Sequence, residues 1–436
     1  MSSTTFRRSI QELDDTGAHW QRQIMPPDGL HYCPPSAGGW GIFRAGLLVP
    51  ESLLLFVSPA GCGRHGAISS LQLGYRRRLY FLHIDEVDIV TGRHMERIPS
   101  AVAEIMASAH PRPKAMIVCA SCIDDLLGSD YDRLAGEMAA VHGIPFRVIH
   151  MNPIATDGKM PPTLMVQRGV YDFLERSSER DAMVNVVGNF VPIDTTSEFY
   201  EVMARAGVRR IGQVGACATI DEFRRLSRAG HNILIRPEGR LAVQHMAQKL
   251  GIPYCFAPAA YSMDTIDRTY RLMEQCLGVA LCTQEYREQA EAAVSFYRRA
   301  LGPLTVAVGS RTNVGTFELA RALAEYGFRV RYVFADMLVD FDLEHVAWLK
   351  DHVPDLVVLT NIHPTMVDFV GQRHAVDLAI GLDAGYFCPD AHTVPLTLET
   401  QPYGYRGVVE LLREMAQALE SPRRHREQMY AAGTVA

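Results

Sequence analysis

The chain has 436 residues, of which 48% are hydrophobic and 21% are charged, and this composition is typical of a globular protein with more than one hydrophobic core. Its 43 basic and 49 acidic side chains give a formal net charge of -6, which argues against nucleic acid as a partner because phosphate binding needs a basic surface. No apolar run approaches the roughly 18 residues that span a bilayer, and the N-terminal residues are polar, so we expect no membrane association and a cytoplasmic location.

Residues 1–28 are predicted to form a polar N-terminal arm. The continuous apolar run at residues 53–57 is typical of a parallel strand that is buried on both faces. Further strands are predicted nearby, at residues 79–81, 115–118 and 146–150, with a helix over 100–109. We therefore expect an α/β domain over residues 29–160.

The same alternation of strands and helices continues through two more predicted domains, at residues 161–300 and 301–436. The strands expected in them lie at residues 183–187, 211–214, 233–235, 304–308, 329–334 and 356–360. The helices expected in them lie at residues 198–206, 263–277, 284–301, 316–326 and 407–419, and one more ends at residue 250. Alternation of this kind implies parallel sheets, so the predicted fold class is α/β with three Rossmann-like domains.

Three of the nine cysteines stand out by position. Cys62 lies in a Gly-Cys-Gly turn after the 53–57 strand, and Cys33 lies upstream. Cys122 is predicted to lie in a turn that follows the 115–118 strand and is closed by Gly128. Thiolates are the ligands that iron–sulfur clusters prefer, and the common clusters need four, so a second chain would have to complete the set. The spacings of 29 and 60 residues match no compact ferredoxin or zinc motif, so buried free cysteine remains an alternative.

Other patterns favour structural interpretations. Cys119 and Cys122 have the spacing of a redox dithiol, but Cys119 ends an apolar strand and is expected in the core. The 309–315 turn lacks the glycine spacing and the lysine of phosphate-binding loops, so we expect a plain strand-to-helix turn. The basic run 76–78 is expected to face solvent, and the stretch 83–88, rich in His, Asp and Glu, matches no metal-ligand spacing.

The order of these motifs resembles the nitrogenase component 1 family. The motifs that carry the resemblance are Cys33, Gly61-Cys62-Gly63, Cys122 with Gly128 and Asp130, Asn361-Ile362-His363-Pro364 and Gly404-Tyr405-Arg406-Gly407. They span nearly the whole chain, and the family also has three α/β domains.

The resemblance implies that Cys33, Cys62 and Cys122 hold an electron-relay iron–sulfur cluster at a subunit interface. A partner that supplies three more cysteines would give an eight-iron, P-cluster-like centre, and a partner that supplies one would give a four-iron cluster. The implied partners are a paralogous α-type subunit in a heterotetramer and a separate ATP-dependent iron–sulfur reductase protein.

The resemblance also indicates a β-type subunit. The cofactor cysteine of an α-type subunit would fall at residues 235–237 and the cofactor histidine at 393–396, and neither stretch has that residue. A contribution to the cofactor pocket stays open through the adjacent His392 and through Cys255, Cys276 and Cys282. The expected function is electron relay to a catalytic site mainly on the partner, with reductive C–S cleavage of methylthio-alkanes. The alternatives are a tetrapyrrole reductase subunit and a scaffold for iron–sulfur cofactor assembly.

Overall fold

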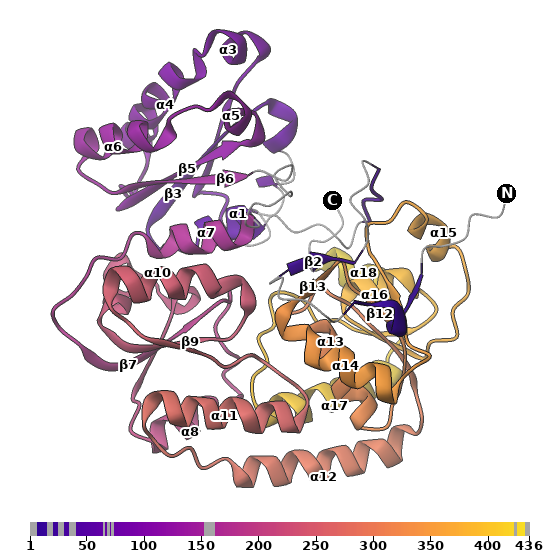
Figure 1. Ribbon diagram of the computed structural model, residues 1–436. Coiled ribbons are helices and arrows are strands. Elements are labelled where there is room, and N and C mark those ends of the chain that lie inside the picture. The colour runs from indigo at the N-terminus through magenta and orange to yellow at the C-terminus, as the bar shows by residue number, and fades with distance from the viewer. Residues whose placement is uncertain are drawn as a thin grey trace. The chain divides into compact units, whose positions relative to one another are not determined.

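The computed structural model describes residues 7–14, 21–24, 30–34, 41–63, 66–67, 70, 74–151, 162–422 and 425–431 (Figure 1). The chain divides into two compact units, each built from separate stretches of sequence. Unit 1 comprises Met1–Gly38, Val191–Val208 and Phe256–Val435. Unit 2 comprises Gly39–Phe190 and Arg209–Cys255.

The first sheet of unit 2 has parallel strands in the order β4-β3-β5-β6. The strands are β3 (Ser52–Ser58), β4 (Leu79–His83), β5 (Ala115–Ser121) and β6 (Phe146–Met151). Every residue of β3 and β5 is buried, as expected for the apolar sequences of central parallel strands. Helices cover both faces: α4 (His94–Ser108) and α6 (Tyr131–His142) on one, α1 (Gly41–Gly46) and α7 (Pro162–Tyr171) on the other (Figure 1).

The second sheet of unit 2 has the strand order β10-β9-β7-β8. Its strands are β7 (Asp181–Val187), β8 (Arg210–Gln213), β9 (Ala229–Leu234) and β10 (Tyr254–Phe256). β7 runs parallel to both β8 and β9. The helices that follow β8 and β9 are α9 (Ile220–Arg225) and α10 (Arg240–Leu250), and α10 packs against α7.

Unit 1 is built on a sheet with the strand order β1-β14-β12-β11-β15-β16. Its strands are β1 (Arg8–Ser9), β11 (Thr305–Val308), β12 (Arg329–Phe334), β14 (Val357–Leu359), β15 (Leu378–Ile380) and β16 (His392–Val394). All neighbouring strands in it are parallel except β1, which is antiparallel to β14. A separate antiparallel pair joins β2 (Gln21–Gln23) to β13 (Met337–Val339).

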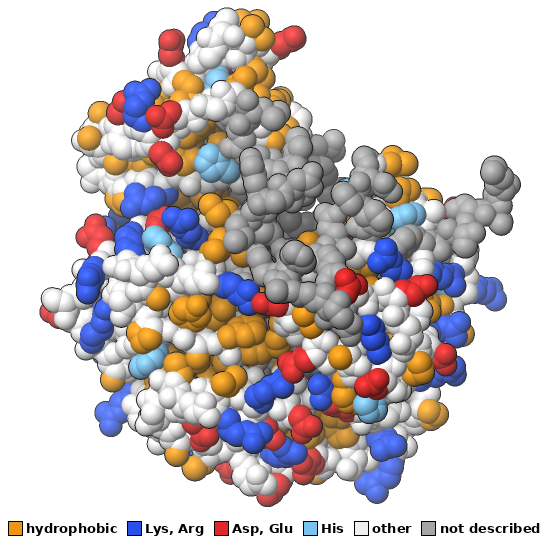
Figure 2. Space-filling view, viewed as in Figure 1, with side chains coloured by type: hydrophobic (Ala, Val, Ile, Leu, Met, Phe, Trp, Pro, Cys, Tyr) orange, Lys and Arg blue, Asp and Glu red, His pale blue; other side chains and the backbone are white. Residues whose placement is uncertain are grey.

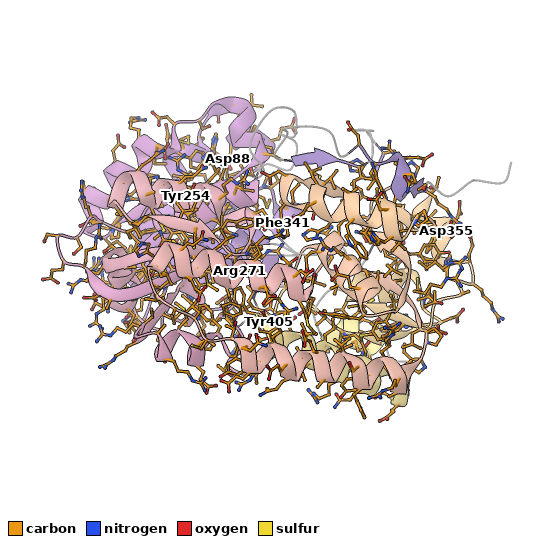
Figure 3. All side chains as sticks on the ribbon, turned by 60° about the horizontal axis from the view of Figure 1, so that its bottom comes forward. Asp88, Tyr254, Arg271, Phe341, Asp355 and Tyr405 are labelled. Carbon is orange, nitrogen blue, oxygen red and sulfur yellow. The ribbon has the colours of Figure 1, made fainter. Side chains whose placement is uncertain are left out.

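The longer helices of unit 1 pack on this sheet and on one another. They are α11 (Met263–Leu277), α12 (Gln284–Leu301), α13 (Thr316–Glu325), α14 (Leu343–His352) and α17 (Tyr405–Glu420). The shorter ones are α8 (Phe199–Arg205), α15 (Met366–Val370), α16 (Leu382–Phe387) and α18 (His425–Ala431). α17 lies along α12, and Tyr405 lies between α11 and α12, where it stacks on Tyr270 (Figure 3). On the face in Figure 2, acidic and basic side chains intermix over α11 and α12.

The predicted α/β architecture with mostly parallel sheets is confirmed. The described parts of the predicted N-terminal arm supply β1 and β2, so the arm is partly built into unit 1. The domain boundaries proposed at residues 29, 161 and 301 remain predictions. Within the described ranges, no helix combines the length and the apolar character needed to cross a bilayer.

Candidate functional site

Cys62 and Cys122 come together at one edge of the first sheet of unit 2. β3 and β5 are neighbouring parallel strands, with Val57 opposite Ala120, so the residues after them share the carboxyl-terminal edge of the sheet. Cys62 lies in a single turn of 3-10 helix, Ala60–Gly63, where its backbone amide donates to the Pro59 carbonyl at 3.0 Å. Burial raises the pKa of the Cys62 thiol, and the nearby Cys122 raises it further. The two thiols are therefore electrostatic neighbours.

Cys122 is the first residue of a short helix, α5 (Cys122–Leu127), so the predicted turn at this position is wrong. Gly128 follows the helix with a φ of 66°, and the Asp130 side chain caps α6 by accepting the Arg133 amide at 3.0 Å. The Cys-x-x-x-x-x-Gly-x-Asp motif thus encodes a helix, a left-handed glycine and the start of the next helix. This arrangement fixes the backbone of Cys122 directly after the buried strand.

The two glycines beside Cys62 differ in their surroundings. A Cβ added to Gly63 would lie 2.7 Å from the ring of Phe81, so close packing requires glycine there. A Cβ added to Gly61 would meet no described atom within 4 Å. Among the described residues, close packing thus constrains the position after Cys62 but not the position before it.

Cys33 lies in unit 1, where it is exposed. The segment that carries it is anchored, because the Tyr32 amide donates to the Ile362 carbonyl at 2.8 Å and the Tyr32 hydroxyl lies 2.5 Å from that of Tyr386. Burial and this second hydrogen bond raise the pKa of the Tyr32 phenol. The convergence of Cys33 with Cys62 and Cys122 stays a prediction.

The thiols of Cys62 and Cys122 suit iron–sulfur chemistry, since they are free, partly exposed and close enough to interact electrostatically. They would supply two of the four ligands that a common cluster requires. Among the residues that the structure describes, no three His, Cys, Asp or Glu side chains gather into a metal site.

Other candidate residues have structural partners. Cys119 and Cys388 are buried, and burial raises the pKa of Cys388 to about 12. The Nδ1 atom of His392 lies 2.9 Å from the Ala418 carbonyl oxygen. Asp88 is buried and pairs with Arg93 at 2.8 Å and with Arg97, which accounts for the most buried acid of the 83–88 stretch.

The basic run 76–78 is only partly solvated. Arg76 and Arg77 are exposed, but the Arg78 guanidinium donates to the backbone carbonyls of Ser52 at 2.9 Å and Val49 at 2.5 Å. Because these carbonyls lie at the start of β3, Arg78 stabilises the beginning of that strand. Burial lowers the pKa of Arg78 from its usual value.

Unit 1 contains a buried polar cluster that the sequence analysis did not predict. Asp383 accepts the Ser310 amide at 2.7 Å, and the Asn361 side chain donates to the Ser310 hydroxyl at 3.0 Å and to Asp336 at 3.2 Å. These residues follow β11, β12, β14 and β15 at the carboxyl edge of the sheet. The polar residues that follow the apolar runs could have indicated this cluster. Asp383 could not be placed in it, because β15 has only three residues and was not predicted as a strand.

The 309–315 turn is held by this cluster. A Cβ at Gly309 would overlap the Asp383 carboxylate, and the Asn313 amide donates to the carbonyls of Leu398 at 2.7 Å and Thr400 at 2.8 Å. These contacts fit the structural strand-to-helix turn that was expected.

Comparisons with known proteins agree with this architecture. The chain is 21% identical over 376 residues to the nitrogenase iron-molybdenum cofactor biosynthesis protein NifE of Rippkaea orientalis, which covers 82% of this chain and 78% of the relative. It is 22% identical to NifE of Rhodobacter capsulatus, over 89% of this chain and 86% of the relative. It is 23% identical to NifE of Nostoc, over 89% of this chain and 85% of the relative.

Solved structures described as nitrogenase Cp1 share the fold. The structure at pH 6.5 has a TM-score of 0.71 at 16% identity, over 94% of this chain and 96% of the other. The structure at pH 5 has a TM-score of 0.67 at 16% identity, over 92% and 90%. The family described as nitrogenase component 1 type oxidoreductase matches residues 39–420. The chain therefore belongs to the nitrogenase component 1 type oxidoreductase family.

Proposed function

We propose that this chain is one subunit of a nitrogenase-like complex and that Cys62 and Cys122 hold part of an iron–sulfur cluster at its interface with a paralogous subunit. The observation that supports this proposal is the placement of two half-buried thiols, which interact electrostatically, after neighbouring parallel strands at one sheet edge. Cys33 is the third ligand in the proposal. A partner with three cysteines would complete an eight-iron cluster, and a partner with one would complete a four-iron cluster.

A cluster bound there would supply single-electron transfer. The role of this chain is to present thiolates, and each thiol must lose its proton to bind iron. Because burial raises the pKa of Cys62, proton loss there is driven by the metal rather than by the free thiol. The close approach of the Gly63 backbone to the Phe81 ring leaves no room for a side chain at the position after Cys62.

The first candidate role is electron relay in a reductase. A separate ATP-dependent iron–sulfur protein would deliver electrons, and the catalytic site would lie mainly on the paralogous subunit. The proposed reaction is reductive C–S cleavage of a methylthio-alkane, and a tetrapyrrole is the alternative substrate class. These assignments rest on family membership and on the motifs given above.

The second candidate role is assembly of an iron–sulfur cofactor for another enzyme. It is favoured by the similarity to NifE proteins, whose name assigns them to cofactor biosynthesis. The same cysteines would serve this role, because an assembly protein also has to hold a cluster.

Cysteine variants test the shared part of the proposal. Cys62→Ala and Cys122→Ala in the anaerobically purified complex should each remove most of the interface iron and its paramagnetic signal. Cys217→Ala is the matched control, because Cys217 is also a half-buried thiol of unit 2. Cys33→Ala is compared with Cys282→Ala, since both of these cysteines are exposed. Equal iron in the test and control variants would refute the ligand assignment.

Turnover separates the two roles. The complex is given a methylthio-alkane, ATP and the reductase protein, and thiol and alkane products are measured by gas chromatography. Product that disappears in Cys62→Ala supports the relay. Loss of cofactor transfer to an apo-enzyme in the same variant, without any product from the wild type, supports the assembly role.

A further inference from the structure

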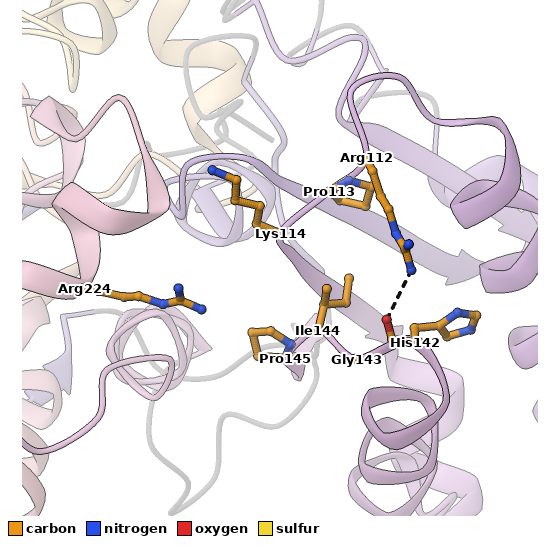
Figure 4. Close-up of a pocket in the computed structure, with 8 residues that line it drawn as sticks. All are labelled: Arg112, Pro113, Lys114, His142, Gly143, Ile144, Pro145 and Arg224. Atoms are coloured by element: carbon orange, nitrogen blue, oxygen red, sulfur yellow. Dashed lines mark hydrogen bonds between the residues drawn. The ribbon is translucent and has the colours of Figure 1, made fainter.

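A second candidate site lies in unit 2 at the amino-terminal edge of its first sheet. A pocket of about 480 Å³ is formed by the segment before β5, the segment between α6 and β6, and α9 (Figure 4). β5 and β6 begin side by side, with Met116 opposite Phe146. Cys62 and Cys122 follow the opposite ends of their strands, so this pocket is separate from the proposed cluster site.

The pocket is rich in positive charge. Arg112 donates to the His142 carbonyl at 3.3 Å and, among the described residues, forms no ion pair with a carboxylate. The Lys114 amine lies 2.9 Å from the Oε1 atom of Glu51. The Arg224 guanidinium lies 3.5 Å from the carboxylate of Asp221, whose side chain is 70% exposed. Three cations thus face two carboxylates, one of them well solvated, and the balance favours an anion.

The backbone beside the pocket is strained. Glu51 has a φ of 55°, the one positive φ among the described residues other than glycine. Its carboxylate accepts the Lys114 amine at 3.0 Å and the Ile220 amide at 2.8 Å. Ile220 begins α9, the helix that carries Arg224, so Glu51 fixes both cations relative to the sheet. A left-handed residue other than glycine is unfavourable and is retained where surrounding contacts require it.

The floor of the pocket is apolar. Pro113 is buried, and Ile144 and Pro145 are half-buried. The Arg224 side chain reaches from α9 toward Ile144 and Pro145 (Figure 4). The volume falls within the range of small-molecule sites, about 300–1,000 Å³, and such sites combine an apolar lining with a few charged groups.

We propose that this pocket binds a phosphorylated small molecule of nucleotide size. Arg112 and Arg224 approach the pocket from opposite sides of Ile144 and Pro145 (Figure 4). Both bind phosphate oxygens of the ligand, because the guanidinium fork matches such oxygens in pairs. Pro113, Ile144 and Pro145 pack against the flat apolar part of the ligand. Lys114 supplies the remaining charge from its fixed position beside Glu51.

Calorimetric titration of the full chain with AMP, adenosine and inorganic phosphate tests the proposal at low ionic strength. AMP should bind, and adenosine and phosphate should each bind at least tenfold more weakly. Arg112→Gln and Arg224→Gln should each weaken AMP binding at least tenfold. Arg133→Gln, near the other end of α6, removes an equal charge from the same unit and should leave AMP binding unchanged.

Absence of AMP binding to the wild type, or equal weakening in Arg133→Gln, would overturn the proposal. If phosphate bound as tightly as AMP, the apolar residues would contribute nothing to binding. That result would contradict the assignment of a nucleotide-sized ligand. Hydrogen exchange on the wild type gives a measurement that does not depend on variant folding. AMP should slow exchange in residues 114–116 and 142–146 but not in residues 131–134, and uniform slowing would contradict the assignment.

Discussion

The carboxylate of Glu198 accepts the backbone amide of Tyr405 at 2.5 Å, although these two residues are far apart in the chain. The same carboxylate accepts the Arg406 amide at 3.0 Å and the Tyr270 hydroxyl at 2.9 Å. Tyr405 begins α17, so a buried acid from another part of unit 1 caps the amino terminus of this helix. The contact explains why the motif at residues 404–407 carries glycine at its first position.

Gly404→Ala should destabilise the fold strongly. Gly404 has a φ of 75°, and a Cβ there would overlap the Glu198 carboxylate and lie 2.7 Å from the Tyr270 hydroxyl. The left-handed backbone and the overlap together should cost about 3 kcal/mol of unfolding free energy. Gly278→Ala is the matched control, because Gly278 has a φ of 66° and no described atom within 4 Å of such a Cβ. Urea unfolding should show the larger loss in Gly404→Ala, and equal losses would disprove the capping account.

Gly63→Ala should destabilise unit 2, whereas Gly61→Ala should have little effect on its stability. Alanine at Gly63 places its Cβ 2.7 Å from the Phe81 ring, and overpacking of this kind costs about 1–3 kcal/mol. Alanine at Gly61 meets no described atom within 4 Å, so stability should hardly change. Thermal unfolding of the metal-free chain measures both effects, and a lower midpoint for Gly61→Ala than for Gly63→Ala would contradict this description of the turn.

Glu318 should make the stability of unit 1 depend on pH. Its buried carboxylate accepts the amides of Tyr261 and Ser262 at 2.7–3.0 Å, and burial raises its pKa from 4.5 to about 7. A raised carboxyl pKa means that the folded state binds the proton more tightly than the unfolded state does. The stabilisation is therefore complete below pH 4.5 and is lost as the pH rises through about 7.

Glu318→Gln removes this titration. Relative to that variant, the wild type should lose about 3 kcal/mol of unfolding free energy between pH 4.5 and pH 7. The measurement is a series of urea unfolding curves across this range. Glu288→Gln, at an exposed position on α12, serves as the control and should show a constant difference. A constant difference for Glu318→Gln as well would rule out the buried titration.

Cys62 should react slowly with iodoacetamide in the metal-free chain. Burial and then Cys122 raise its pKa above the usual value, so less of the reactive thiolate is present at neutral pH. The pH midpoint of alkylation, followed by mass spectrometry, should lie above that of a free cysteine, about 8.5. It should fall in Cys122→Ser, and an unchanged midpoint would show that the two thiols do not interact.

Long elements of the fold could be predicted because their patterns repeat over many residues. The bounds of α11, α12 and β12 match the predicted ranges at both ends. β15 and β16 have three residues each and β1 has two, and segments of this length carry no measurable periodicity. Their pairing depends on neighbouring strands, which a local pattern does not reveal.

The candidate site was predictable in part for the same reason. The strands before Cys62 and Cys122 could be predicted from their apolar sequences, so both cysteines could be expected at the edge of a sheet. The helix that Cys122 begins has six residues and ends before a left-handed glycine, and the local composition there resembles a turn. The capping role of Glu198 and the orientation of Arg224 depend on contacts between distant segments, and no local pattern encodes them.

The chain leaves and re-enters each unit, passing between them after residues 38, 190, 208 and 255. Unit 1 therefore draws on both ends of the chain, whereas the contiguous stretch 39–255 contains nearly all of unit 2 together with one short segment of unit 1. β1, at Arg8–Ser9, pairs with β14 at Val357–Leu359, so β1 is synthesised long before the strand that it pairs with. Unit 2 can be completed much earlier during translation, and truncated products should accumulate with unit 2 protected from protease and unit 1 digested.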